Sequence, residues 1–108
     1  MTVRAWRRGD VCWCDADKTR PVVIVTRDPL IAHLSNLTVA PLTTRIRGIA
    51  SQVILETFDG VTERCAISLD NLQTVPKSAL GTLIASLNKT RLRELQRAAI
   101  FALELDAF

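Results

Sequence analysis

Seven short β-type runs, separated by turn-forming residues, constrain the fold of this chain more than any other feature. Each run is four to seven residues long, and Asp59-Gly60 between two of them is a typical hairpin-turn signal. Runs of this length and spacing indicate a compact, largely antiparallel β-barrel. The expected strands are Gly9–Cys14, Arg20–Thr26, Leu37–Leu42, Gln52–Glu56, Cys65–Leu69, Leu72–Val75 and Leu83–Leu87.

Short helical segments are expected between the strands. Asp28 as N-cap, with Pro29 in the first helical position, predicts a short helix through about Leu34. Pro76–Leu80 is expected to form a single helical turn. The predicted fold class is therefore mainly β with short helices.

A longer helix is expected at the end of the chain, capped by Asn88. Apolar residues recur there on one helical face, at Leu92, Leu95, Ala99 and Ala102. Further apolar residues widen this stripe, namely Ile100, Phe101 and Leu103. An oligomer contact and docking of the helix onto the barrel both remain open as explanations.

Composition predicts one domain over residues 1–108, because a chain of this length is too short for two. Its 48% apolar and 23% charged content is typical of a folded protein rather than a disordered one. The formal net charge of +3 favours a polyanionic partner. Basic residues gather at the start of the chain and beside two strand runs, at Arg4, Arg7, Arg8, Lys18, Arg20, Arg45 and Arg47.

The three cysteines and the first residues bear on the compartment. Met1–Arg8 lacks the apolar segment of a signal peptide, and no apolar run reaches the roughly 20 residues of a membrane span. We therefore expect a cytoplasmic protein with reduced thiols and no membrane association. Cys12 and Cys14 are expected to be packing thiols, since structural zinc sites prefer four ligands at other spacings. No metal or other cofactor is expected.

Arg20 is the first candidate for chemistry, because Lys18-Thr19-Arg20-Pro21 leads directly into the apolar run Val22–Val25. An arginine at the mouth of a buried strand offers five fixed N–H donors to a phosphate. Since a guanidinium stays charged near neutral pH, it is suited to stabilising charge rather than to acting as a general base. A solvated edge-strand arginine is the alternative.

Thr43 and Thr44 follow the run Val39-Ala40-Pro41-Leu42 and place hydroxyls at its exit. Alternation along a strand sends the two side chains to opposite faces, so only one of them can share the site of Arg20. Both can also be ordinary strand-end threonines that satisfy backbone groups.

Acidic and amide side chains supply further candidates. Asp70 and Asn71 are either turn residues or groups that position a nucleobase, and Asp17 lies close to Arg20 in the sequence. His33, the single histidine, is remote from both motifs, and a mechanism with paired imidazoles is therefore excluded.

Together these segments resemble the MazF/PemK family of toxin endoribonucleases, and look most like its short-loop mycobacterial and actinobacterial members. The matching stretches occur in the family's order over nearly the whole chain and are weakest over the last helix. They are Arg8-Gly9-Asp10-Val11 with Trp13, Thr19-Arg20-Pro21-Val22-Val23, Val39-Ala40-Pro41-Leu42-Thr43-Thr44 and Leu69-Asp70-Asn71-Leu72.

The resemblance implies a small SH3-like β-barrel that forms a homodimer through which RNA passes. The implied reaction is metal-independent cleavage of single-stranded RNA, by attack of a 2′-hydroxyl on the adjacent phosphate. The products would be a 2′,3′-cyclic phosphate and a 5′-hydroxyl. A cognate antitoxin with an extended, often acidic tail would cover the RNA site.

The resemblance places the family's catalytic arginine and threonine on Arg20 and Thr43. The expected RNA-binding residues are Asp17, Lys18, Thr44, Arg45, Arg47, Asp70 and Asn71. Asp17 and Asp70 both remain candidates for the base that activates the 2′-hydroxyl.

Three departures from the family pattern stand out. The loop Ala16–Thr19 is shorter than in many members, Cys12 replaces an aromatic residue, and Gln73 stands where many members have a basic residue. The short loop means that the cleaved sequence cannot be transferred from relatives with a longer one.

Two other functions compete with RNA cleavage. One is a basic barrel that binds nucleic acid or protein without cutting it. The other is a gyrase poison with the same barrel, although Leu105-Asp106-Ala107-Phe108 does not match the Trp-containing terminus of that class.

Overall fold

The sheet is built from seven short strands within residues 5–105, the part of the chain that the computed structural model describes. The strands are β1 (Asp10–Asp15), β2 (Thr19–Ile24), β3 (Asn36–Thr43), β4 (Gln52–Leu55), β5 (Cys65–Ser68), β6 (Gln73–Pro76) and β7 (Leu80–Ser86). The helices are α1 (Asp28–Ile31) and α2 (Lys89–Leu103), with single 3-10 turns η1 (Thr57–Asp59), η2 (Leu69–Asn71) and η3 (Lys77–Ala79). Arg4 and residues 106–108 of the tail lie outside the described residues.

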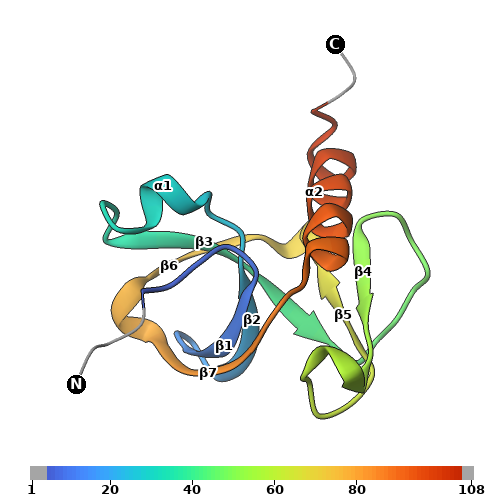
Figure 1. The fold of residues 1–108 in the computed structure, drawn as a ribbon, viewed down its shortest axis with the longest axis horizontal. Coiled ribbons are helices and arrows are strands. Elements are labelled where there is room, and N and C mark those ends of the chain that lie inside the picture. Colours follow the sequence, from blue (N-terminus) through green and yellow to red (C-terminus); the bar gives the residue numbers. More distant parts are fainter. Residues whose placement is uncertain (1–4, 106–108) are drawn as a thin grey trace.

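β3 is the strand around which the sheet curls (Figure 1). All pairings are antiparallel, and the strands follow the order β4-β5-β3-β2-β1-β7, with β6 paired to β3. β3 pairs with β6 along Asn36–Val39 and with β5 at Leu42 and Thr43. Because its two ends have different partners, the sheet bends into a half-barrel. The predicted mainly β fold with a C-terminal helix is confirmed.

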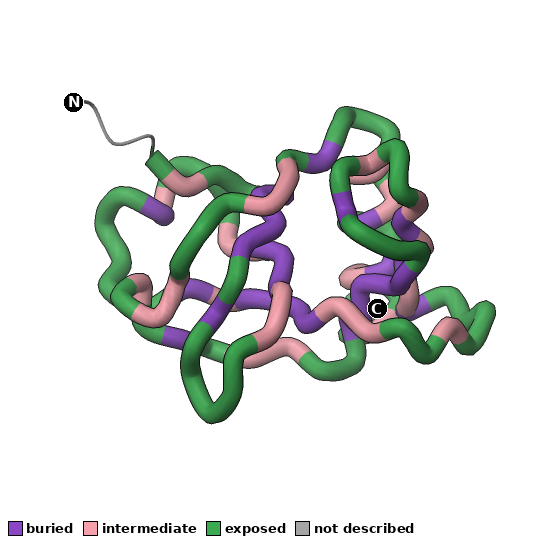
Figure 2. The backbone as a smooth tube through the Cα atoms, turned by 90° about the horizontal axis from the view of Figure 1, so that it is seen from below, coloured by how far each residue is buried: buried purple, intermediate pink, exposed green. Residues whose placement is uncertain are grey.

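Apolar side chains cover both faces of the sheet and form two buried clusters. The first lies under α2 and includes Val23, Ala40, Ile67 and Leu95. The second lies inside the curl beside α1, and consists of Cys12, Cys14, Val22, Ile24, Ile31, Leu37, Val39 and Val75. The buried stretches in Figure 2 accordingly run through the strands.

α2 docks on the first cluster, which accounts for most of its apolar stripe. The Asn88 side chain accepts a hydrogen bond from the Arg91 N–H at 2.9 Å, so the predicted cap is confirmed. Leu95 and Ala98 are buried, and Leu92, Ala99 and Ala102 pack against the cluster. Phe101 and Leu103 remain more than half exposed. Within residues 5–105, no helix is long and apolar enough to cross a membrane.

Two local predictions were wrong. Arg27 rather than Asp28 is the N-cap of α1, which ends at Ile31, and Asp28 Oδ1 instead accepts a hydrogen bond from the Arg8 N–H at 2.7 Å. Asp59-Gly60 is not a two-residue hairpin turn. Asp59 closes η1, its carboxylate accepting from the Glu56 N–H at 2.8 Å, and Gly60 ends that turn at φ +100°.

Candidate functional site

Strand register carries three polar side chains onto the face of the second cluster, at its open end. Arg20 pairs with the buried Cys14 and is two residues from Val22. Thr43 alternates in step with Val39 on β3, and Gln73 is the pairing partner of Val39 on β6. Because alternate residues and antiparallel partners share a face, Arg20, Thr43 and Gln73 continue the apolar surface with polar groups.

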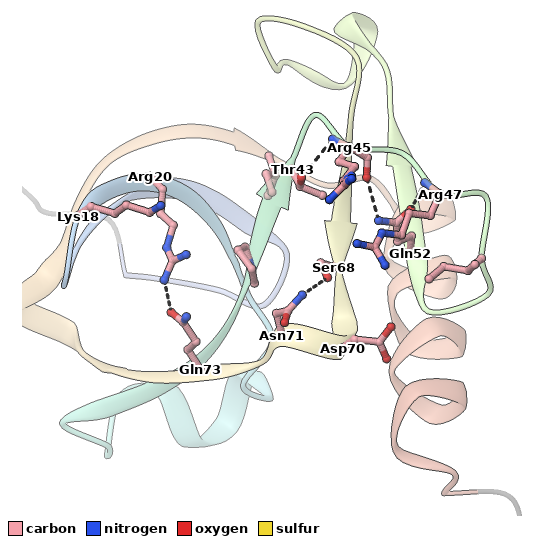
Figure 3. A pocket seen from close by; sticks show the side chains of 13 residues that line it. Lys18, Arg20, Thr43, Arg45, Arg47, Gln52, Ser68, Asp70, Asn71 and Gln73 are labelled. Carbon is pink, nitrogen blue, oxygen red and sulfur yellow. Dashed lines mark hydrogen bonds between the residues drawn. The ribbon is translucent and has the colours of Figure 1, made fainter.

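A cavity of about 640 Å³ opens at this point (Figure 3). Its cationic side chains are Lys18, Arg20, Arg45 and Arg47, and its carboxylate is Asp70. The remaining lining residues are Pro41, Leu42, Thr43, Ile49, Gln52, Ser68, Asn71 and Gln73. The excess of positive charge suits a polyanion.

Arg20 lies half-buried in this wall, with its guanidinium held by a neutral side chain. Its Nη2 donates to Gln73 Oε1 at 2.9 Å, across the mouth of the curl (Figure 3). One terminal nitrogen is thereby anchored, and a guanidinium has further N–H donors for phosphate oxygens.

Thr43 lies at the end of β3 and points its hydroxyl toward the loop that follows. Thr43 Oγ1 accepts a hydrogen bond from the Arg45 N–H at 3.1 Å. With its oxygen held as an acceptor, the hydroxyl has its own proton to donate. Thr44 does not line this cavity but lines a second one of about 470 Å³ with Trp13 and Glu63, and Thr43 borders both cavities.

The basic loop after β3 is fastened by Gln52. Its Oε1 accepts from the Arg47 N–H at 2.8 Å, and its Nε2 donates to the Arg45 carbonyl at 3.2 Å. The backbone on both sides of Ile46 is thus tied to β4. Arg45 and Arg47 themselves are exposed, so their charges are available to a ligand.

η2 supplies the other end of the cavity. Asp70 accepts a hydrogen bond from the hydroxyl of the buried Ser51, and Asn71 Nδ2 donates to Ser68 Oγ at 2.7 Å. Figure 3 shows the Asp70 carboxylate on the far side of the cavity from Arg20. Asp70 therefore lines the cavity without lying beside Arg20.

Besides Thr44, Asp17 and the single histidine also lie away from the cavity lining. Asp17 is exposed in the turn between β1 and β2, where its neighbour Lys18 reaches the cavity. His33 is exposed just beyond α1.

The cysteines are buried among apolar side chains, as expected of packing thiols. Burial, together with the charges of Cys14 and Asp10, raises the pKa of Cys12 to about 12. Burial also raises the pKa of Cys14, although Arg20 acts in the opposite direction.

Sequence reasoning missed the side chains that hold the site together. Ser51, Gln52 and Ser68 fasten its groups, and none belongs to a recognisable motif. In the sequence, Gln73 stands out only as a departure from a family pattern. Its partnership with Arg20 spans 53 residues of sequence, and no local signal indicates it.

Comparison with known proteins identifies the family. Residues 7–103 match the family model described as the PemK-like, MazF-like toxin of type II toxin–antitoxin systems. The chain is 41% identical to Endoribonuclease MazF3 of Mycobacterium tuberculosis over 90 residues, which cover 83% of this chain and 87% of that protein.

Two solved structures are similar as well. The Mycobacterium tuberculosis toxin MazF-mt6 superposes with a TM-score of 0.82 at 37% identity, covering 88% of this chain and 96% of that one. An endoribonuclease from a mycobacterial species, in complex with its cognate antitoxin, gives a TM-score of 0.85 at 27% identity, with coverages of 94% and 97%. The chain belongs to the PemK-like, MazF-like toxin family of type II toxin–antitoxin systems.

Proposed function

We propose that the cavity around Arg20 and Thr43 is the active centre of an endoribonuclease that cuts single-stranded RNA at a short sequence. The observation that carries the proposal is the convergence of Arg20 and Thr43 on one cationic cavity. The relatives that are 41% and 38% identical bear the names endoribonuclease MazF3 and probable endoribonuclease MazF5. The family match over residues 7–103 supports a single toxin domain.

The proposed reaction is a transfer within the RNA. The 2′-oxygen of one nucleotide forms a bond to the adjacent phosphorus, and the bond from phosphorus to the 5′-oxygen of the next nucleotide breaks. The 2′-hydroxyl loses its proton and the departing 5′-oxygen gains one, which leaves a 2′,3′-cyclic phosphate and a 5′-hydroxyl. No metal or other cofactor takes part in this scheme.

Arg20 and Thr43 act on the phosphate as negative charge develops on its oxygens. The guanidinium offers parallel N–H donors to non-bridging oxygens, and the Thr43 hydroxyl donates its own proton, since its oxygen is occupied by the Arg45 N–H. A preorganised donor of this kind typically contributes about 10²–10³ in rate.

The other polar residues bind the flanking RNA. Lys18, Arg45 and Arg47 neutralise neighbouring phosphates, and Asp70 and Asn71 read base edges at the far end of the cavity. Asp17 and Thr44, which do not line this cavity, would meet only nucleotides beyond the cleaved bond.

The toxin would act as a cytoplasmic homodimer that a cognate antitoxin neutralises. A solved relative at 27% identity is an endoribonuclease in complex with its antitoxin. The cationic cavity suits an extended acidic tail, which would occupy the sites of the RNA phosphates.

The test is cleavage of a mixed single-stranded RNA pool in the presence of EDTA, with analysis of the product ends. We expect cutting at a short sequence, with cyclic-phosphate and 5′-hydroxyl ends. A matched oligonucleotide with a 2′-deoxy nucleotide at the cut position should stay intact, because it lacks the attacking hydroxyl. Cleavage of that oligonucleotide, or 5′-phosphate ends, would contradict the mechanism.

A further inference from the structure

We propose that Gln73 is a positioning residue that orients the guanidinium of Arg20 for the phosphate of the cleaved RNA. The inference rests on the proposed function, since it concerns the same cavity. It assigns a role to a side chain that is not among the expected catalytic or RNA-binding residues.

The two residues meet because the sheet curls. Gln73 pairs with Val39 on one edge of β3, and Val39 pairs on the other edge with Ile24 of β2. Arg20 lies near the beginning of β2, and its long side chain reaches across the mouth of the curl to Gln73 of β6 (Figure 3). The bond from Nη2 to Oε1 measures 2.9 Å, and both side chains are half-buried.

The hydrogen bond to Gln73 restricts the rotamers of the Arg20 side chain, which has to be ordered before it can bind a phosphate. A free arginine side chain loses rotamer entropy when it becomes ordered. Anchoring one terminal nitrogen fixes the plane of the guanidinium and leaves other N–H groups for two phosphate oxygens. The ordering is then complete before RNA arrives.

Glutamine is chemically suited to this task. Its carbonyl oxygen accepts a hydrogen bond without cancelling the charge that has to meet the phosphate. A glutamate would hold Arg20 as well but would neutralise it and repel RNA. A lysine or arginine in place of Gln73 would offer no acceptor and would repel the guanidinium. Gln73 is therefore suited to holding the Arg20 guanidinium without neutralising its charge.

The competing explanation is that the bond merely ties β2 to β6. A tie between strands would change stability, whereas a positioning residue changes catalysis through Arg20. The experiment has to separate these two effects.

Single-turnover cleavage of the RNA that the wild type cuts is the first measurement. We expect Gln73→Ala and Gln73→Leu to lower the rate at saturating RNA about tenfold, with a smaller change in KM, because the guanidinium is misoriented rather than removed. Gln73→Glu should raise KM as well, since its charge opposes phosphate binding. Gln96→Ala, an exposed glutamine on α2, is the matched control and should cleave like the wild type.

A double-mutant cycle tests whether Gln73 affects cleavage through Arg20. In the Arg20→Ala background, measured with excess enzyme over long incubation, adding Gln73→Ala should cause no further loss. Independent, multiplying losses would overturn the proposal. So would a wild-type rate in both Gln73→Ala and Gln73→Leu.

Nuclear magnetic resonance of the arginine guanidinium groups tests the orientation without relying on activity. We expect slowed rotation of the Arg20 guanidinium, assigned by its absence in Arg20→Ala, and fast rotation in Gln73→Ala. Equal rotation in both proteins would overturn the positioning role even if cleavage falls. If the wild type cuts no RNA, the proposed nuclease function is wrong, and so is the expected effect of Gln73 on cleavage. The spectrum would still show whether Gln73 holds the Arg20 guanidinium.

Discussion

At the scale of single residues, two buried cysteines of the second cluster share a sheet face with the charged side chain of Arg20. Cys12 and Cys14 are buried on the same face as Arg20, and Cys14 is its pairing partner across β1 and β2. Burial raises the pKa of all three cysteines, and nearby carboxylates act in the same direction at Cys65. The thiolate is the reactive form of cysteine. These thiols are therefore unreactive for two reasons: burial keeps reagents away, and the raised pKa keeps the thiols protonated.

We predict that the native protein reacts slowly with a thiol reagent at pH 8, whereas all three thiols react at once in denaturant. Unfolding should restore both exposure and ordinary acidity to Cys12, Cys14 and Cys65. Kinetics with Ellman's reagent check this. A fast-reacting thiol in the folded protein would show that one of them lies at an accessible position.

Single residues of the site were predictable where the signal is local. Alternation predicts that only one of Thr43 and Thr44 shares the site of Arg20, and the family resemblance selects Thr43. Thr43 but not Thr44 lines the cavity with Arg20. Asp17 was assigned to the RNA-binding set on sequence proximity, but its turn carries it away from the cavity lining. Gln73 could not be paired with Arg20, because their meeting depends on the register of β6 against β3.

At the scale of elements, α2 is joined to η1 by an ion pair around Arg91. The guanidinium contacts Asp59 through two hydrogen bonds of 3.1 and 3.2 Å, contacts Glu94 at 3.1 Å, and lies 5.5 Å from the ring centre of Phe58. The Asp59 side chain is only 2% exposed. Burial by itself raises the pKa of Asp59, but bonds from Arg91 and the Glu56 N–H outweigh it, and the pKa is lowered.

This pair predicts a pH dependence of stability. Because the pKa of Asp59 is lower in the folded state than its unfolded value of about 3.9, its contribution is complete above that value. The contribution is lost as the pH falls through the folded pKa. Urea unfolding of the wild type should therefore show a loss of stability below about pH 4.

The Asp59→Asn variant supplies the comparison. We expect it to be less stable than the wild type at pH 7, since Arg91 loses its charged partner, and to lose less stability on acidification. An identical acid response in both proteins would show that Asp59 does not carry the effect.

The elements themselves were largely predictable from local patterns. The N-cap residue Asn88 predicts the start of α2. The strands are predictable because apolar and β-branched residues occur in short runs between turn-forming residues. Boundaries failed where a side chain has a tertiary partner. Asp28 accepts a hydrogen bond from the Arg8 N–H instead of capping α1. Asp59 accepts hydrogen bonds from Arg91 and from the Glu56 N–H instead of forming a hairpin turn.

At the scale of the whole molecule, one cavity is lined by four of the 14 basic residues and by a single carboxylate. Composition could indicate a polyanionic partner but could not place it. The curl of the sheet brings Lys18 and Arg20 to the same cavity as Arg45 and Arg47 of the loop after β3. The clustering of these basic side chains depends on the topology of the sheet, so it could not be predicted from the sequence alone.

This charge predicts a salt-dependent affinity for RNA. For single strands the logarithm of the binding constant falls with a slope of about −0.7 per phosphate contacted, on a logarithmic salt scale. Arg45→Ala and Arg47→Ala should each flatten the slope by about 0.7. Binding of an uncleavable 2′-O-methyl RNA at several salt concentrations checks this, and an unchanged slope in both variants would place the phosphates elsewhere.

The most direct test of the account compares RNA cleavage by the wild type, Arg20→Ala and Thr43→Ala, each verified as folded by circular dichroism. Arg93→Ala and Thr90→Ala remove the same side chains from exposed positions on α2 and serve as matched controls. We predict a loss of about 10²–10³ in rate for Arg20→Ala and at least about tenfold for Thr43→Ala, with both controls like the wild type. Wild-type cleavage by both Arg20→Ala and Thr43→Ala would contradict the assignment of this cavity as the active centre.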